Sequence, residues 1–380
     1  MTGDKYLGVL EVMGGGSGFI RRRESGYVPG ANDIYVPQKL IQQFGLRTGD
    51  EISGEVGRSP GRGKNPPLAR LEAVNGRPPE EMRNRPDFTR LSALHPQEQL
   101  VLECDIRRRG QPDHTNRVID LFCPFGKGQR ALIVAPAKAG KTTVLQRIAE
   151  GIATNHPECR LILLLVDERP EEVTEMEASG FGEVVASSFD CPPEHHVAVA
   201  EITLERARRQ VELGKDVVLI LDSITRLARA YNAIETGSGR TLTGGLDANS
   251  LEKPKRFLGS ARNVDLKHGG GSLTIIATAL VDTGSRMDQV IFEEFKGTGN
   301  SELVLSRELA DRRIFPAIDL VASATRREEL LLSEEALAVS SMLRKEFAGS
   351  TPADAMNTLL ALMRQTESNE AFVGKLLARA

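Results

Sequence analysis

The sequence predicts an α/β protein with two domains, in which a small β-barrel resembling an OB-fold precedes a larger domain with a mainly parallel sheet and helices on both faces. Three observations predict it. Short β segments broken by turns fill the first 75 residues, apolar runs of strand length alternate with amphipathic helical segments after residue 116, and one such run leads directly into a short loop that opens a helix. At 380 residues the chain is long enough for about two domains.

Composition restricts the class of protein. Hydrophobic residues make up 40% and charged residues 27% of the chain, and no apolar run reaches the roughly 18 to 20 residues of a membrane span. Met1 does not lead into a basic segment and an apolar signal core, so we expect a soluble, cytoplasmic protein with no membrane partner. The formal charge of −3 argues against a generally basic nucleic-acid coat, although a small basic excess in the first 90 residues permits an anionic partner there.

The cysteines do not indicate a metal site or a disulfide framework. There are four, they contain no C-x-x-C pair, and His195 and His196 lie too irregularly around Cys191 for tetrahedral ligation. We expect reduced, unliganded thiols.

The barrel is expected in residues 1–75. Its strands are predicted in YLGVLEVM, GGGSGFIRRR, NDIYVP, DEISGEV and ARLEAV, because these short runs are separated by Gly, Pro, Asn and Asp. Leu40, Ile41 and Phe44 have helical spacing and predict one short helix within the barrel. Residues 76–115 are rich in Pro, Arg and Glu and are expected to form a connector on the surface.

Residues 116–380 are expected to form the larger domain. Buried parallel strands are predicted in RALIVA, RLILLLV, EVVASSF, DVVLIL and SLTIIATALV, because these continuous apolar runs alternate with helical patterns. The stretch from Ser333 onward is predicted to be helical.

The loop after the first of these runs has the features of a nucleotide-binding P-loop. The strand ending at Ala135 leads into PAKAGKTT, and the following residues have the apolar spacing of a helix. Gly140 would let backbone N–H groups approach a phosphate, Lys141 would reach the β- and γ-phosphates of ATP, and the Thr142 hydroxyl would bind Mg²⁺. Lys138 adds a second positive charge, and Ala139 and Thr143 complete the predicted phosphate cradle.

One residue departs from the usual P-loop pattern, because Ala135 stands where the first glycine is expected. We predict that it is the end of the strand, where a β-region backbone suits alanine as well as glycine, and that Pro136 starts the turn. The loop should therefore close without that glycine. The alternative is a glycine-poor structural turn.

Carboxylates are predicted at the same edge of the sheet, where ligands bind in open α/β folds. Asp222 ends the run KDVVLILDS, as expected of a Walker B carboxylate that serves Mg²⁺. The strand ending at Val166 is followed by Asp167, Glu168 and Arg169, so Glu168 is a candidate general base for water, with its neighbours as orienting groups. The alternative for Glu168 is an acidic cluster at a helix N-terminus.

With these motifs in view, the chain closely resembles the bacterial transcription termination factor Rho family. The resemblance runs from about Leu7 to the C-terminus and far exceeds a generic P-loop. The matching segments, in family order, are VAPAKAGKTT, DERPEEVTEM, LDSITRLARAYN, LTGGLDAN, GGGSLTIIATALVDTGSRMD, EEFKGTGN and RRIFPAID.

The resemblance implies a RecA-like ATPase that forms a homohexameric ring, translocates 5′ to 3′ along single-stranded RNA and releases transcripts from the RNA polymerase elongation complex. In such a ring each nucleotide site lies at a subunit boundary, where arginines can act in trans. The resemblance identifies Arg326 as the arginine finger, Arg313 as a second arginine at the site, and Phe315 as the aromatic that stacks on adenine. From the residues alone, surface salt bridges and a core phenylalanine remain the alternatives.

The resemblance also predicts two RNA sites. In the pore, it places Arg240 and Thr243 in the family's Q loop and Arg286 in its R loop, although ordinary solvated loops are the alternative without it. In the barrel, Phe19 and Tyr35 match base-contacting positions, and Arg21 beside them is a candidate phosphate contact.

The chain departs from the family pattern in two places. Ser17 stands where many relatives carry an aromatic, and a later strand lacks another, so base stacking should be weaker and the pyrimidine preference less certain. Many relatives also have a small helical subdomain before the barrel, whereas Met1 precedes the barrel here by only a few residues.

Two other classes of function compete with this interpretation. A rotary or export ATPase also joins a β-barrel to a RecA-like core in a hexamer, but it needs neither basic pore loops nor barrel aromatics. A protein that only binds nucleotide would not need the combination of Lys141, Thr142, Glu168, Asp222 and Arg326.

Overall fold

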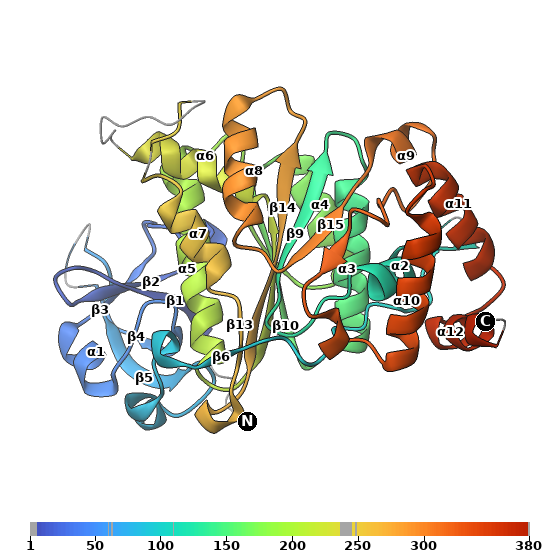
Figure 1. Cartoon of the computed structure of the whole chain (residues 1–380). Helices are drawn as coiled ribbons and strands as arrows, with labels where there is room; N and C mark the ends of the chain where they lie inside the picture. The colour runs from blue at the N-terminus through green and yellow to red at the C-terminus, as the bar shows by residue number, and fades with distance from the viewer. Residues whose placement is uncertain are drawn as a thin grey trace.

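The computed structural model describes residues 6–59, 61, 64–108, 110–235, 245–247 and 249–378. The N-terminal barrel lies against one side of a larger α/β domain, and the C-terminal helices lie at the opposite end of that domain (Figure 1).

The barrel sheet has five antiparallel strands in the order β3-β2-β1-β4-β5. Its core consists of alternating apolar side chains such as Leu10, Ile20 and Ile52, with Ile41 covering one end. The elements are β1 (Tyr6–Val12), β2 (Gly18–Arg21), β3 (Ile34–Val36), α1 (Gln38–Phe44), β4 (Glu51–Val56) and β5 (Leu68–Val74). The five predicted strands and the short helix are therefore all present.

The larger domain is built on a mainly parallel sheet in the order β11-β10-β12-β14-β9-β15-β16. The five predicted apolar runs form five neighbouring strands of this sheet, of which β11 is the edge strand. They are β9 (Arg130–Pro136), β10 (Arg160–Glu168), β11 (Glu183–Ser188), β12 (Asp216–Asp222) and β14 (Ser272–Val281). Two short strands that the sequence did not indicate complete one edge, β15 (Ser301–Val304) and the antiparallel β16 (Ala324–Thr325).

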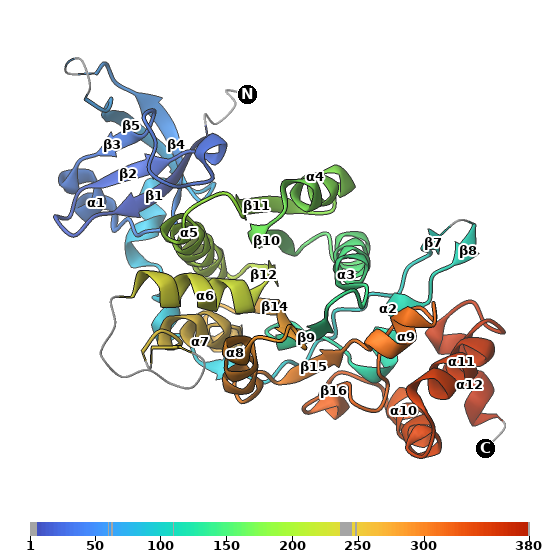
Figure 2. The ribbon, with the colours of Figure 1, turned by 90° about the horizontal axis from the view of Figure 1, so that it is seen from above.

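Helices cover both faces of this sheet (Figure 2). Successive residues of β10 point to opposite faces, so Leu163 packs in the core beneath α3 while Ile162 and Leu164 pack beneath α5 and α6. On one face lie α3 (Lys141–Asn155) and α4 (Pro170–Ser179), and on the other α5 (Pro193–Val211), α6 (Ile224–Ile234), α7 (Glu252–Gly259) and α8 (Arg286–Lys296). The remaining helices are α2 (Thr115–Phe122), α9 (Arg307–Asp311), α10 (Glu334–Phe347), α11 (Pro352–Met363) and α12 (Asn369–Leu377).

The connector is more deeply integrated than a surface segment. Phe88 packs in the core of the larger domain, and Leu100 and Leu102 are fully buried against α2 and α3. Its strand β6 (Ala93–Leu94) pairs with β13 (Arg262–Val264), which joins β14. The expectation of a surface connector was wrong, because its apolar residues supply part of the core. A two-stranded hairpin, β7 (Arg107–Arg108) with β8 (Gln111–Pro112), follows.

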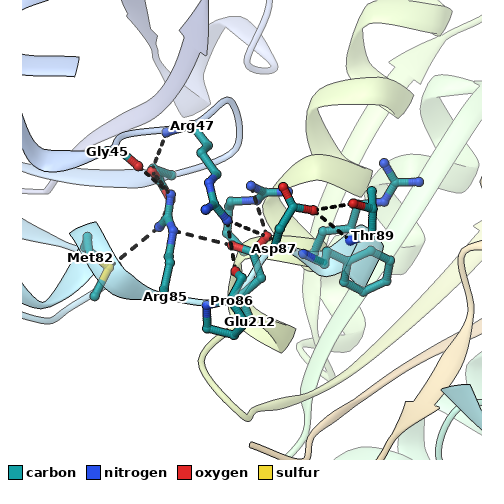
Figure 3. A network of polar contacts seen from close by, with 12 residues as sticks. Gly45, Arg47, Met82, Arg85, Pro86, Asp87, Thr89 and Glu212 are labelled. Carbon is teal, nitrogen blue, oxygen red and sulfur yellow. Dashed lines mark hydrogen bonds and ion pairs between the residues drawn. The ribbon is translucent and has the colours of Figure 1, made fainter. Parts of the chain in front are cut away.

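A polar network fixes the barrel to the larger domain (Figure 3). The buried Arg85 guanidinium makes two hydrogen bonds to Asp50, at 2.6 and 2.7 Å, and its Nε lies 3.4 Å from Glu212 at the end of α5. Glu212 also pairs with Arg47 of the barrel at 3.1 Å. Because the partners come from the barrel, the connector and α5, the network ties all three together.

Across the part of the chain that the structure describes, no helix combines the length and apolar character needed to span a membrane.

Candidate nucleotide and RNA sites

The predicted ATP-site residues meet at the carboxyl edge of the sheet. The P-loop follows β9, Asp222 ends β12 and Glu168 ends β10, and β14 lies between β12 and β9. Since neighbouring parallel strands end at the same edge, the fold brings together residues that lie far apart in the sequence.

The P-loop begins as predicted with an alanine in a strand. Ala135 is buried in β9 and pairs in register with Leu280 of β14, so no glycine is needed there. Gly140 has φ of +89°, in the left-handed region that glycine adopts readily, and α3 starts at the next residue. Its free backbone N–H groups and the positive end of its dipole suit a phosphate.

The other predicted cradle residues lie around this helix start. Lys138 is exposed, with φ of +64°, and Ala139 is buried beneath the loop. Thr142 and Thr143 occupy the first turn of α3, where the Thr142 hydroxyl lies 3.5 Å from Glu172. Burial and the negative charge of Glu168 raise the pKa of Glu172.

Lys141 links the two carboxylates that the sequence predicts at the site, Glu168 and Asp222. Its ammonium lies 2.8 Å from Glu168 Oε1 and 2.6 Å from Asp222 Oδ1, and both carboxylates are buried. Burial would lower the pKa of Lys141, but the charges of Asp222 and Glu168 outweigh it and raise that pKa. The site therefore holds a cation and two carboxylates away from bulk water, where charges interact strongly.

Two residues of the site were missed by sequence reasoning. Arg226 Nη1 lies 3.0 Å from Glu168 Oε2 and donates to the backbone carbonyl of Asp167. The Thr278 hydroxyl, in the middle of β14, donates to Asp222 Oδ1 at 2.6 Å. Arg226 lies within the family-like segment LDSITRLARAYN, two residues into α6, so its position after Asp222 was the available signal. For Thr278 the only sequence signal was that a polar residue lies within a buried apolar run.

Phe315 and Arg313 lie near the P-loop. Phe315 is 43% exposed and its ring reaches Gly140, since a Cβ built on Gly140 would lie 3.9 Å from Phe315 Cε1. This favours a base-stacking aromatic over a core phenylalanine. Arg313 is exposed and has φ of +58°. Arg169, at the N-cap of α4, is also exposed and directly follows Glu168.

Arg326 lies at the opposite edge of the sheet. It follows β16, whose Thr325 pairs with Ser301, and Ser301 pairs with Ala131 near the start of β9. The P-loop begins five residues further along β9, roughly 16 Å away at the usual rise per strand residue. Arg326 is exposed, and its charge contributes, after burial, to lowering the pKa of Arg130. It is therefore not part of its own subunit's phosphate site.

Of the three predicted pore-loop residues, the structure describes only Arg286. Arg286 is exposed and begins α8, directly after the loop that follows β14. Val281, the last residue of β14, pairs with Pro136, so this loop starts beside the P-loop. Arg240 and Thr243 lie outside the described residues.

The barrel presents the two predicted aromatics together. The rings of Phe19 and Tyr35 lie 5.8 Å apart on paired strands, edge to face, and both are partly exposed. Arg21 is instead buried and pairs with Glu11 and Asp33, each at 2.5 Å, while its guanidinium lies 5.2 Å from the Phe19 ring. This arrangement favours Arg21 as a support for Phe19 over the predicted phosphate contact.

The residues fit a Mg²⁺ ion that arrives with a nucleotide. Within the described ranges no cluster of three or more His, Cys, Asp or Glu side chains could hold a metal alone. Mg²⁺ is usually held by one or two carboxylates together with substrate phosphates, and the Asp222 carboxylate and Thr142 hydroxyl supply oxygen ligands beside the P-loop.

Comparisons with known families divide the chain as the fold does. Residues 6–80 match the family described as Rho termination factor, RNA-binding domain, and residues 115–325 match the ATP synthase alpha/beta family, nucleotide-binding domain. The first range covers the barrel, and the second covers the central strands of the sheet with the P-loop, Glu168 and Asp222.

Whole-length relatives extend the match. The chain is 53% identical over 365 residues to transcription termination factor Rho of Cereibacter sphaeroides, covering 96% of this chain and 85% of that protein. It is 54% identical over 366 residues to the Rho of Chromobacterium violaceum, with 96% and 86% covered. Against the Rho of Streptomyces lividans it is 54% identical over 370 residues but spans only 51% of that protein.

Solved structures with a similar fold include two from bacterial secretion systems. One is a prototypical ATPase of the type III secretion system, with a TM-score of 0.58, 26% identity and coverage of 69% of this chain and 82% of that one. The other is the ATPase EscN of enteropathogenic Escherichia coli with its central stalk EscO, with a TM-score of 0.58, 25% identity and coverage of 77% and 73%.

Proposed function

This chain belongs to the Rho family of transcription termination factors, and from that premise we propose that it is an RNA-stimulated ATPase and 5′ to 3′ translocase. Six copies would form a ring that binds nascent, single-stranded RNA in the cytoplasm and releases it from the RNA polymerase elongation complex. The observation that carries the proposal is the joint presence of an aromatic RNA-binding barrel and a complete P-loop site in one chain.

ATP binding uses the start of α3. The N–H groups after Gly140 hold the phosphates, Lys141 moves its charge from the carboxylates to the β- and γ-phosphates, and the Phe315 ring beside the loop stacks on adenine. Thr142 and Asp222 would hold a Mg²⁺ ion that arrives with ATP, and that ion would supply positive charge beside the phosphate oxygens. Lys141 therefore changes partners when the nucleotide binds.

Hydrolysis needs a base and a group that stabilises negative charge. The Glu168 carboxylate, once Lys141 has turned to the phosphates, is available to accept a proton from the attacking water. Arg226 remains beside Glu168 and holds it in place. Arg326 lies at the amino edge of the sheet, away from its own P-loop, which suits a finger that enters the site of the adjacent subunit. Arg313 adds a further positive charge two residues before Phe315.

The strand β14 connects the nucleotide site with the predicted RNA-binding R loop. Thr278 on this strand bonds to Asp222, and three residues further on the strand ends and leads to Arg286. A shift of Asp222 on ATP binding is therefore passed along a single rigid strand to the R loop. The Q-loop residues Arg240 and Thr243 are expected to contact the RNA backbone with Arg286.

The test is steady-state ATP hydrolysis by the full chain without nucleic acid, with cytosine-rich RNA, with uridine-rich RNA, and with single-stranded DNA of equal length. We expect strong stimulation by RNA, with a reduced cytosine preference because Ser17 replaces an aromatic. Hydrolysis that is robust but indifferent to nucleic acid would favour the rotary or export class, to which the type III secretion ATPases belong.

A further inference from the structure

A polar cluster lies beside the end of β10, the strand that carries the candidate base Glu168. It consists of Ser187 on β11 and His195 and His196 in the first turn of α5. The Ser187 hydroxyl lies 2.7 Å from His195 Nδ1 and 2.6 Å from His196 Nδ1. Ser187 and His196 are buried, so these contacts are not exchanged for water.

The cluster faces an irregularity in β10. The pairing of β10 with β11 shifts register between Val166 and Glu168, so Asp167 is an extra residue, and its φ is +57°. A bulge of this kind redirects the side chains that follow it. Here the residue that follows is Glu168, and the redirection turns its carboxylate toward Lys141 and Arg226.

The imidazoles have a defined hydrogen-bond pattern. Burial lowers the pKa of His195 and of His196, so both are neutral at pH 7. A hydroxyl has one proton, so Ser187 donates to one ring nitrogen and accepts from the other, which must carry its proton on Nδ1. The pair of bonds therefore fixes both ring orientations and the hydroxyl rotor.

The cluster connects the bulge with the barrel. On the inner side His196 Nε2 lies 4.0 Å from Asp167 Oδ1. On the outer side His195 Cε1 would lie 4.0 Å from a Cβ on Gly26, in the barrel turn that packs on this part of β11. The His195 ring therefore lies beside the barrel turn, and the His196 ring lies beside the bulge at Asp167.

We propose that Ser187 and His196 are positioning residues for Glu168, which hold the Asp167 bulge so that the carboxylate points at the attacking water. This inference rests on the proposed ATPase function. Neither side chain touches the nucleotide, so their effect should appear in the rate of hydrolysis and not in the affinity for ATP.

The test compares RNA-stimulated hydrolysis of the full chain for Ser187→Ala, His196→Leu and His196→Asn. We expect Ser187→Ala and His196→Leu to lower kcat about five- to tenfold, the rate equivalent of one buried hydrogen bond, with KM for ATP changed less than twofold. The His196→Asn amide can still reach Ser187, so this variant should recover most of the lost rate. RNA affinity, measured by fluorescence anisotropy, should stay unchanged in all three.

Ser340→Ala is the matched control. Its hydroxyl is equally buried, on α10 at the far side of the domain, and has no hydrogen-bond partner in the described part of the chain. It should leave kcat unchanged. A kcat within twofold of the parent for both Ser187→Ala and His196→Leu, or a His196→Asn variant as slow as His196→Leu, would overturn the inference. An inactive parent chain would instead refute the ATPase function itself.

Discussion

The seam between the barrel and the ATPase domain contains a carboxylate whose contribution to stability can be calculated. Glu183, at the start of β11, accepts two hydrogen bonds from Arg206, at 2.6 and 2.7 Å. Arg206 and Arg160 also bind Glu51 of the barrel, and the Tyr27 hydroxyl donates to Glu183 at 3.0 Å. Removing the Glu183 charge therefore leaves the buried Arg206 and the half-buried Arg160 with one carboxylate between them.

The pKa of Glu183 sets the expected magnitude. Burial alone would raise this pKa, but Arg206 and then Arg160 outweigh burial and lower it from 4.5 to about 2. This lowering of the pKa corresponds to roughly 3 kcal/mol, because a tenfold change in proton affinity is worth about 1.4 kcal/mol. Since the folded-state pKa lies below the unfolded one, this stability is present above pH 4.5 and is lost as the pH falls toward 2.

The perturbation is Glu183→Gln, which keeps the shape of the side chain and removes the charge. Urea unfolding followed by circular dichroism should show a loss of about 3 kcal/mol at pH 7, and the difference from the parent should shrink to about half that value at pH 3. Glu177→Gln, an exposed carboxylate at the end of α4, is the control and should cost little at either pH. An equal loss for Glu183→Gln at pH 7 and pH 3 would refute the electrostatic explanation.

Four further outcomes follow from the site. Glu168→Ala should still bind ATP but lose hydrolysis by a factor of about 10² to 10⁴, whereas Lys141→Ala should lose hydrolysis and bind ATP weakly, as filter binding would show. Phe315→Ala should raise KM for ATP about tenfold and Phe315→Tyr should not, because the lost contact is ring stacking. Arg326→Ala should be inactive alone but recover part of its activity when mixed with Glu168→Ala subunits; no recovery would place the finger in its own subunit. Arg286→Ala should reduce RNA-stimulated turnover while binding at the barrel stays intact, and equal loss of both would contradict two separate RNA sites.

Much of the fold followed from local pattern. Each predicted apolar run of the larger domain forms a strand of the sheet, because a strand buried on both faces must be continuously apolar. The edge strands β15 and β16 have four and two residues and mixed polarity, so no periodicity marked them. Likewise the connector looked like a surface segment because Phe88 and the short run at residues 100–102 stand among Pro, Arg and Glu residues, and their burial comes only from tertiary contacts.

The residues of the candidate site were predictable wherever a single sequence segment contains both the strand and the functional residue that follows it. The P-loop, Asp222 and Glu168 were found because each directly follows its own strand. Thr278 and Ser187 were not, since their importance comes from strand register, which places them opposite Asp222 and the Asp167 bulge. Arg21 was misinterpreted for the same reason, because its two carboxylate partners are near it only in the folded barrel.

The position of Arg326 in the sheet bears on how neighbouring subunits would share a nucleotide site. Glu168 and Lys141 stand at the carboxyl edge, whereas Arg326 stands at the amino edge because β16 runs antiparallel to β15. An arginine there cannot approach its own γ-phosphate without the loss of the β15–β16 pairing, but it is exposed to an adjacent copy. In the ring that we propose, each subunit would therefore carry one half of two different nucleotide sites, and such half-sites would be completed only in a head-to-tail assembly. In a ring built this way, the rate of hydrolysis at each site depends on the contact between two subunits as well as on the bound nucleotide. The order in which the subunits hydrolyse ATP can therefore follow the geometry of their interfaces.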